Sequence, residues 1–254
     1  MILKNKVAIV TGGGAGIGEE ICQRYAREGA SVVVADIDNQ KAEAVAQSLT
    51  SMDNQHLAFS VDVSKHDQVC DLARNVEDRF GKIDILVNSA GISKFGPISN
   101  LSIEFWHQVV DVNLNGLFYC CLETAKVMMK KKSGKIINIS SLAGLIGIPN
   151  QSPYVASKHG VVGLTKALAA DLGPYKINVN CICPATTMTS MGLATRSPEF
   201  FEAESHKTPL DRMATPEDHA KVATFLASDE SEFLTGVILP VDGGRIAALR
   251  AHDD

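Results

Sequence analysis

Short apolar runs alternate with longer stretches of helical periodicity along almost the whole chain. The first two runs, K-V-A-I-V-T at 6–11 and S-V-V-V-A-D at 31–36, are rich in β-branched residues and apolar through their centres. Such runs are typical of strands buried in a parallel sheet. Strands are therefore expected near 6–11, 31–36, 57–62, 83–88, 135–140, 177–183 and 237–241, with helices between them.

This alternation indicates an α/β protein with a doubly wound Rossmann fold, in which a single parallel sheet of about seven strands carries helices on both faces. No linker, repeat or low-complexity segment interrupts residues 1–254, so a single domain is expected. Only the stretch 186–209 has weak periodicity. It follows the carboxyl end of a strand, where ligands bind in such sheets, so it is predicted to be a substrate lid; the alternative is an irregular surface loop. Its apolar residues are Met188, Met191, Leu193, Phe200 and Phe201.

A glycine-rich segment, T-G-G-G-A-G-I-G, joins the first strand to a helical pattern over Glu19–Glu28. Strand, glycine turn and helix together form the context of a phosphate-binding loop. Glycines let the backbone approach a pyrophosphate, and the helix N-terminus offers unpaired N–H groups and a positive dipole end. The glycines Gly12, Gly16 and Gly18 are spaced G-x-x-x-G-x-G rather than G-x-G-x-x-G. A flexible turn without a ligand is the alternative for this loop considered alone.

The second strand ends in Asp36, 18 residues after Gly18. An acid at about this interval accepts hydrogen bonds from the hydroxyls of an adenosine ribose and repels a 2′-phosphate. The next residues, Ile37 and Asp38, do not provide the basic side chain that NADP needs. The cofactor is therefore predicted to be NAD. The alternative is that Asp36 only ends the strand or caps the next helix.

A proton relay is predicted from Tyr154 and Lys158, which stand four apart in Y-V-A-S-K. Positions i and i+4 share one face of a helix, and an ammonium beside a phenol favours the phenolate, so the pair suits proton donation and acceptance. Ser141, thirteen residues earlier, adds a hydroxyl. Tyr-x-x-x-Lys alone is more often a surface pair; the glycine loop favours the catalytic interpretation.

With these motifs in order, the chain resembles the short-chain dehydrogenase/reductase family over nearly its whole length. The resemblance implies that Ser141, Tyr154 and Lys158 are catalytic and that Asn113, in D-V-N-L-N-G, holds a water linking Lys158 to solvent. It implies hydride transfer between NAD(H) and a secondary alcohol or ketone, and a homotetramer. The cofactor-binding residues that it implies are Gly12, Gly14, Gly16, Ile17, Gly18, Asp36, Ile37, Asp62, Val63, Asn88, Ala90, Gly91, Tyr154, Lys158, Pro184, Thr187 and Thr189.

Three positions depart from the family pattern. Ser89 replaces the second Asn of N-N-A-G, a mild change at the sheet end. Ala185 replaces the Gly that usually follows Pro184, and Ala does not tolerate the positive φ that Gly adopts. Thr187 stands where a β-branched aliphatic residue is usual. An unusual shape of the nicotinamide loop is therefore expected, with the proton relay unaffected.

Composition narrows the class further. A net charge of −5 argues against a nucleic-acid surface, and 45 % hydrophobic with 21 % charged residues is ordinary for a globular protein. No signal peptide or membrane-spanning run is recognisable, so a cytoplasmic protein is expected. The six cysteines have neither the pattern of a disulfide framework nor that of a zinc knuckle, so free thiols and no metal are predicted.

Two other functions remain open at this stage. One is reduction of a 3-oxoacyl thioester on an acyl carrier protein, which needs a basic docking patch. The lid offers only Arg196, His206 and Lys207 beside several glutamates, and Asp36 conflicts with the usual NADPH preference of such reductases. The other is a non-catalytic NAD-binding sensor or scaffold, which would not need a Ser-Tyr-Lys set. The apolar lid residues suggest an apolar or ring-bearing alcohol.

Overall fold

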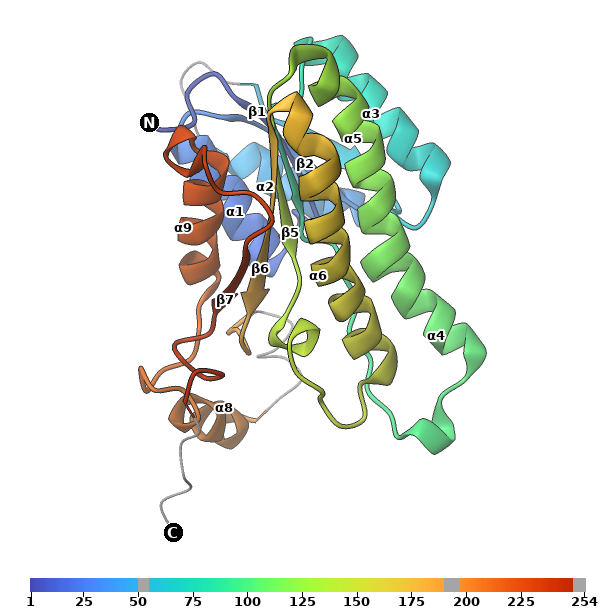
Figure 1. Ribbon diagram of the computed structural model, residues 1–254, viewed down its shortest axis with the longest axis vertical. Coiled ribbons are helices and arrows are strands. Elements are labelled where there is room, and N and C mark those ends of the chain that lie inside the picture. The colour runs from blue at the N-terminus through green and yellow to red at the C-terminus, as the bar shows by residue number, and fades with distance from the viewer. Residues whose placement is uncertain (50–54, 190–196, 249–254) are drawn as a thin grey trace.

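The computed structural model describes residues 1–49, 55–189 and 197–248 and contains one seven-stranded parallel sheet (Figure 1). Its strand order is β3-β2-β1-β4-β5-β6-β7, with all registered pairs parallel, which confirms the doubly wound class. The strands are β1 Val7–Thr11, β2 Ser31–Asp36, β3 Leu57–Ser60, β4 Ile85–Asn88, β5 Gly134–Ile139, β6 Ile177–Pro184 and β7 Ile238–Val241.

Helices cover both faces of the sheet because the strands are apolar on both faces. The helices are α1 Gly16–Arg27, α2 Asn39–Ser48, α3 His66–Phe80, α4 Ile103–Val110, α5 Leu117–Lys131, α6 Ser152–Leu172, α8 Pro198–His206 and α9 Pro216–Ala227. Successive residues of β1 alternate between two cores: Val7 and Ile9 pack on the side of α3, α5 and α6, whereas Ala8 and Val10 pack on the side of α1, α2 and α9. Figure 1 shows these two helical layers.

Two segments differ from the simplest expectation. The helical stretch 103–131 is not one uniform α-helix, because a π-helical turn over Asp111–Gly116 joins α4 to α5. Such turns are rare and occur frequently at functional sites. The stretch 186–209 is not wholly irregular, since it contains α8, capped by the Ser197 hydroxyl that accepts from the Phe200 N–H. Met191, Leu193 and Arg196 lie outside the described residues.

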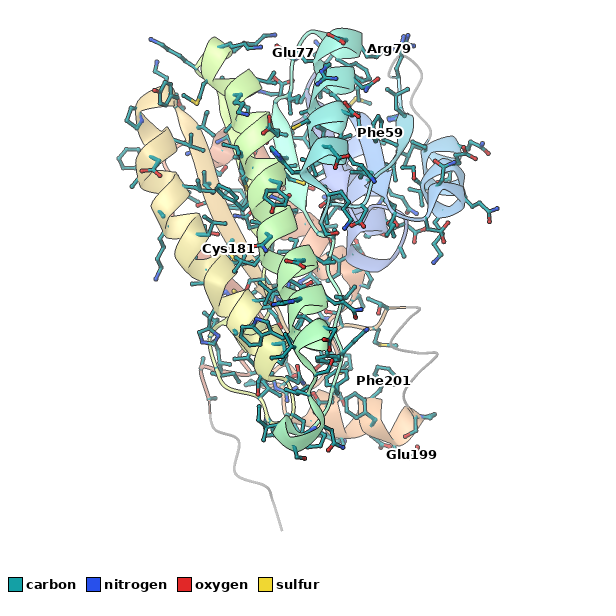
Figure 2. The ribbon with its side chains drawn as sticks, turned by 90° about the vertical axis from the view of Figure 1, so that its right-hand side faces the viewer. Phe59, Glu77, Arg79, Cys181, Glu199 and Phe201 are labelled. Atoms are coloured by element: carbon teal, nitrogen blue, oxygen red, sulfur yellow. The ribbon has the colours of Figure 1, made fainter. Side chains whose placement is uncertain are left out.

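The parallel arrangement brings the carboxyl ends of all seven strands to one edge of the sheet. Helix α8 lies beyond this edge, at the lower end of the molecule in Figure 1, and Figure 2 shows Glu199 and Phe201 on it, at the opposite end from Glu77 and Arg79 of α3. In the described part of the chain, no helix combines the length and the apolar character needed to cross a membrane.

Candidate active site

The predicted Tyr-Lys pair lies near the start of α6, with its two side chains on one face. The Lys158 Nζ is 5.6 Å from the centre of the Tyr154 ring. It donates a hydrogen bond of 2.9 Å to the backbone oxygen of Ile139, the last residue of β5. Lys158 is buried, and a buried ammonium requires such partners. The carbonyl of Ile139 therefore holds a positive charge beside the phenol.

Ser140, which follows β5, ties the strand end to the same turn of α6, and Ser141 caps the short turn that comes next. The Ser140 hydroxyl donates to the backbone oxygen of Lys158 at 2.9 Å. The absence of a side chain at Gly144 allows this contact, because a Cβ there would lie 2.4 Å from the Ser140 Oγ. The Ser141 Oγ accepts from the Ala143 N–H at 3.1 Å. That bond uses an acceptor position, so the Ser141 O–H can still donate to a substrate oxygen.

Asn113 lies in the π-helical turn, fully buried, and pins the loop after β4. Its side-chain oxygen accepts from the Ile92 N–H at 2.8 Å, and its amide donates to the Ile92 oxygen at 2.9 Å and the Ser157 hydroxyl at 3.2 Å. A Cβ on Gly91 would lie 3.3 Å from the Asn113 oxygen and 3.6 Å from the Lys158 Nζ. The backbone of Gly91 therefore lies beside both groups.

The glycine loop is closed by contacts that only glycine permits. Gly12 has φ 64°, and a Cβ on it would lie 2.7 Å from the Cα of Ala90. A Cβ on Gly18, in the first turn of α1, would lie 2.1 Å from the backbone oxygen of Gly12. Side chains at either position would push the loop away from β4 or from the helix. The close packing leaves the N-terminus of α1 facing the loop, as a bound pyrophosphate requires.

Both carboxylate oxygens of Asp36 accept a backbone hydrogen bond, one of them from this loop. One oxygen accepts from the Gly14 N–H at 2.9 Å, and the other accepts from the Asp38 N–H at 3.0 Å. Helix α2 is capped by Asp38, whose side chain accepts from the Lys41 N–H, and not by Asp36. The alternative of Asp36 as a helix cap is therefore wrong. The residues fit a dinucleotide, because a carboxylate is bonded to a glycine loop that leads into the N-terminus of a helix.

The other predicted cofactor residues lie along the same sheet edge. The Asp62 carboxylate accepts from the Ser64 N–H and hydroxyl at 3.0 and 2.7 Å, which fixes the turn that carries Val63 into α3. The Asn88 side chain points inward instead, and its amide donates to the Asn138 oxygen at 2.9 Å. Of Asn88, therefore, only the backbone is oriented to meet a cofactor at this edge.

Ala185, the first residue after β6, has an ordinary backbone conformation. Its φ is not positive, and its N–H donates to the Val241 oxygen at 3.2 Å, so the unusual loop shape expected from the sequence is not seen at this residue. The Thr187 hydroxyl donates to the Ala185 oxygen at 2.8 Å and lies 2.8 Å from the Nε2 of His219. The threonine hydroxyl therefore stabilises the turn from within.

His219 was not identified from the sequence, where it has no distinctive spacing. It is fully buried in the first turn of α9, and burial lowers the pKa of its imidazole to about 4. Its Nδ1 has no hydrogen-bond partner among the described residues. An unpaired nitrogen is less costly as an acceptor than as a donor, which favours the tautomer in which Nε2–H donates to Thr187.

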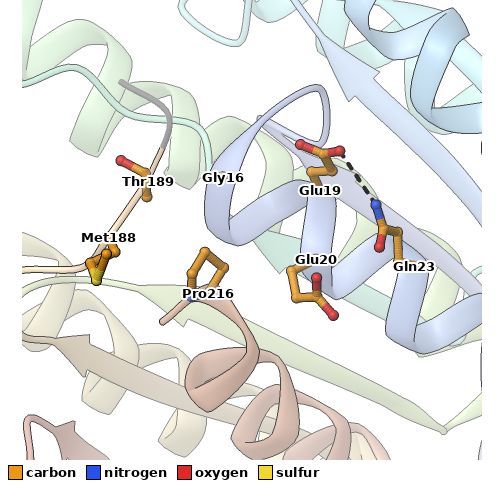
Figure 3. Close-up of a pocket in the computed structure, with 7 residues that line it drawn as sticks. All are labelled: Gly16, Glu19, Glu20, Gln23, Met188, Thr189 and Pro216. Carbon is orange, nitrogen blue, oxygen red and sulfur yellow. Dashed lines mark hydrogen bonds between the residues drawn. The ribbon is translucent and has the colours of Figure 1, made fainter. Parts of the chain in front are cut away.

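A pocket of about 210 Å³ opens between the first turns of α1 and the segment after β6 (Figure 3). Gly16 and Thr189, both predicted cofactor residues, meet in its wall, since a Cβ on Gly16 would lie 3.3 Å from the Thr189 methyl carbon. The remaining wall residues are Glu19, Glu20, Gln23, Met188 and Pro216.

The buried carboxylate of Glu204 joins helix α8 to segments that precede and follow it in the chain. It accepts from the Thr186 hydroxyl at 3.0 Å and forms ion pairs with Lys207 and with Arg245, which lies beyond β7. Burial alone would raise the pKa of this carboxyl, but the bonds from Arg245, Lys207 and Thr186 outweigh it and lower the pKa to about 2. The anchoring role of Glu204 was not predicted from the sequence, because its partner Arg245 lies 41 residues away.

Known proteins match nearly the whole chain, and they are oxidoreductases. A family model described as enoyl-(acyl carrier protein) reductase matches residues 12–245. The 3-oxoacyl-(acyl-carrier-protein) reductase of Chlamydia trachomatis is 40 % identical over 247 residues, covering 96 % of this chain and 98 % of the relative. The 2-(S)-hydroxypropyl-CoM dehydrogenase 3 of Xanthobacter autotrophicus is 38 % identical over 250 residues, with 96 % and 98 % covered.

Solved structures agree with the sequence relatives. The crystal structure of levodione reductase superposes with a TM-score of 0.93 at 33 % identity, covering 97 % of this chain and 100 % of the other. The match thus includes the sheet, the glycine loop and the helix that carries Tyr154 and Lys158. The chain belongs to the short-chain dehydrogenase/reductase family and is an oxidoreductase that exchanges hydride between a nicotinamide cofactor and an alcohol or ketone.

Proposed function

We propose that the protein is an NAD-dependent dehydrogenase of a small secondary alcohol, or a reductase of the corresponding ketone. The proposal rests on one observation: the parallel sheet brings the carboxylate of Asp36 and the Tyr154–Lys158 pair to the same edge, on opposite sides of the glycine loop strand. An anchored acid suits an unphosphorylated ribose, and the phenol–ammonium pair suits proton transfer to an alkoxide.

Bound NADH would supply the hydride in the reducing direction. Tyr154 would donate the proton to the developing alkoxide, and Lys158, held by the Ile139 oxygen, would stabilise the phenolate that remains. Ser141 would donate a hydrogen bond to the same substrate oxygen as charge develops on it. Lys158 would also donate to the nicotinamide ribose.

Asn113 has two parts in this proposal. Its side chain holds Ile92, and with it the backbone of Gly91 beside Lys158. Its oxygen has a second lone pair, which would accept from a water that links Lys158 to solvent. The relay would then return a proton to Tyr154 without moving any part of the fold.

Asp36 carries the choice of NAD over NADP. Each of its oxygens already accepts one backbone N–H, so the carboxylate cannot turn away from a 2′-phosphate without losing these bonds. The remaining lone pairs of the carboxylate would accept hydrogen bonds from the ribose hydroxyls. Two like charges at that place would cost several kcal/mol, which corresponds to well over tenfold in affinity.

The experiment that tests the proposed function is a panel of secondary alcohols assayed with NAD and with NADP, following absorbance of the reduced cofactor. Turnover with NAD, lost in Tyr154→Phe, would support it. Turnover with neither cofactor, in a protein that still binds NAD, would favour the non-catalytic sensor. Equal affinity for the two cofactors would contradict the role of Asp36.

A second candidate is reduction of a 3-oxoacyl thioester on an acyl carrier protein, the reaction named for the relative from Chlamydia trachomatis. Against it, basic side chains of the lid already pair with acids: Lys207 with Glu204 at 2.7 Å and His206 with Asp211 at 3.2 Å. Among the lid residues that the structure describes, an acidic carrier would find few uncompensated cations. Comparing the acetoacetyl group on a carrier protein with the same group on a short thiol tests this candidate, since a strong preference for the carrier would favour it.

Residues 186–209 would form the lid and close over the substrate, with Glu204 as the anchor of α8.

A homotetramer is supported by large apolar side chains exposed along α4 and α5, including Trp106, Phe118 and Leu122. Light scattering coupled to size exclusion measures the mass, and a monomer at micromolar concentration would contradict this part.

A further inference from the structure

We propose that His66, Cys70 and Glu123 form a binding site for a borderline divalent cation, Zn²⁺ in particular, between α3 and α5. None of these residues belongs to the proton relay or the cofactor site, so the proposal is independent of the proposed function. No metal was expected from the sequence, because the cysteines lack the spacing of a zinc knuckle. Folding brings them together, with two ligands one helical turn apart on α3 and the third on α5.

Two of the three donor separations are already close to those that a metal needs. All lie within 4.8 Å of one another. The His66 Nε2 is 3.5 Å from the Cys70 Sγ and 2.8 Å from a Glu123 oxygen. In a tetrahedral zinc site, bond lengths of about 2.1 and 2.3 Å leave neighbouring donors about 3.3–3.6 Å apart. The N···S distance therefore needs no change, and the N···O distance must open by only about half an ångström.

One ligand of the site is buried and another is accessible to solvent. Glu123 is buried against α3, while the His66 side chain is 48 % exposed and gives a path from solvent. The His66 ring rests on the ring of Tyr119, with centroids 5.0 Å apart, which limits its rotation. Three protein ligands with a fourth position open to water is an arrangement that zinc adopts. A thiolate and an imidazole disfavour Mg²⁺ and Ca²⁺.

The ammonium of Lys126 would compete with a metal ion for the Glu123 carboxylate. Its Nζ bonds both Glu123 oxygens at 2.8 Å, and its side chain is 57 % exposed. Metal binding would displace the ammonium from the carboxylate into water and release the thiol proton of Cys70. The occupied site would carry the thiolate, the carboxylate and the cation, and it would join α3 to α5 by a coordinate link.

The test uses the full chain, purified with a chelator and titrated with Co²⁺ as an optical probe for the zinc site. A thiolate-to-cobalt charge-transfer band is expected, saturating at one equivalent per chain and abolished by a competing equivalent of Zn²⁺. Cys70→Ser should lose the band. An absent band in the wild-type protein, or a band retained in Cys70→Ser, would overturn the proposal.

Two further variants test the site without changing a ligand, so the result does not depend on whether Cys70→Ser folds. Lys126→Gln keeps all three ligands and removes the competitor, so Co²⁺ affinity should rise by about two- to fivefold, the worth of an exposed ion pair. Lys130→Gln is the control for removing a positive charge from the same helix, because Lys130 pairs with Glu77 of α3, at 2.7 Å, instead of with a ligand. Affinity unchanged in Lys126→Gln, or raised equally in Lys130→Gln, would contradict the site.

Discussion

Lys158 lies 5.6 Å from the centre of the Tyr154 ring and is held there by the backbone oxygen of Ile139, at 2.9 Å. The ammonium is therefore positioned by the end of β5, and not by the phenol alone. Because Ser140 binds the Lys158 backbone at the same turn, the strand end and the helix form one unit. A substitution at either side chain can then remove chemistry without moving the other.

Tyr154→Phe should lower turnover by a factor of about 10² or more, the usual worth of a positioned proton donor. Cofactor affinity should stay nearly unchanged, since only the hydroxyl is lost. Single-turnover kinetics and a cofactor titration measure the two effects separately. Substantial activity in this variant would mean that the proton comes from another group.

Lys158→Met keeps the length of the stem and removes the charge. The rate of alcohol oxidation should then rise only at higher pH, because the phenolate loses its stabilising cation. Cofactor affinity should weaken as well, since a donor to the ribose is lost. The measurement is the pH–rate profile beside that of the wild-type enzyme. An unchanged pH–rate profile together with unchanged cofactor binding would mean that Tyr154 and Lys158 have no catalytic role.

Asp36→Ala should relax the preference for NAD by tenfold or more, because the repulsion of a 2′-phosphate disappears. Asp38→Ala is the matched control: it removes the N-cap side chain of α2, two residues away, and keeps the backbone N–H from which Asp36 accepts. The measurement is the dissociation constant of NAD and of NADP for the wild-type protein and the two variants. An equal change of preference in both variants would assign the effect to the fold of the loop.

Several parts of this molecule could be read from the sequence because their signals are local. The strands follow from apolar runs, and Tyr154 and Lys158 meet because i and i+4 share a helix face. The π-helical turn that carries Asn113 was missed, since one extra residue per turn hardly disturbs the apolar pattern. The inward orientation of Asn88 depends on Asn138, which is 50 residues away.

The contacts that the sequence did not reveal join segments that are distant along the chain. Glu204 meets Arg245, 41 residues later, and His219 meets Thr187, 32 residues earlier. Charged and polar residues have many potential partners, and their spacing carries no period that selects one of them. Only the assembled sheet brings these side chains into contact, which is why the anchors of the lid and of the nicotinamide segment appear first in the structure.

Glu204→Gln should detach α8 from the Arg245 segment and lower the stability at neutral pH. The carboxyl has a pKa of about 2 in the native state, below its usual 4.5, so its stabilising contribution is complete above pH 4.5 and is lost as pH falls towards 2. The contribution is at most about 3 kcal/mol. Urea unfolding at several pH values measures it, and the variant should lack this part of the acid dependence. Equal stability of both proteins at pH 7 would contradict the anchor.

His219 gives the sharpest test of stability against pH. Its pKa of about 4 in the native state lies below the usual 6.5, so between these values the unfolded chain binds a proton that the native protein does not. Native stability should therefore fall as pH decreases from 6.5 to 4, by up to about 3 kcal/mol, with no contribution above pH 6.5.

His219→Gln keeps a donor toward Thr187 and cannot titrate, so this slope should vanish while stability at pH 8 changes little. His219→Leu also removes the titration, but it leaves the Thr187 oxygen without its donor and should lower stability at every pH by about 1–2 kcal/mol. The measurement is the urea midpoint of the three proteins from pH 4 to 8. An acid slope that persists in His219→Gln would show that a different group takes up the proton on unfolding.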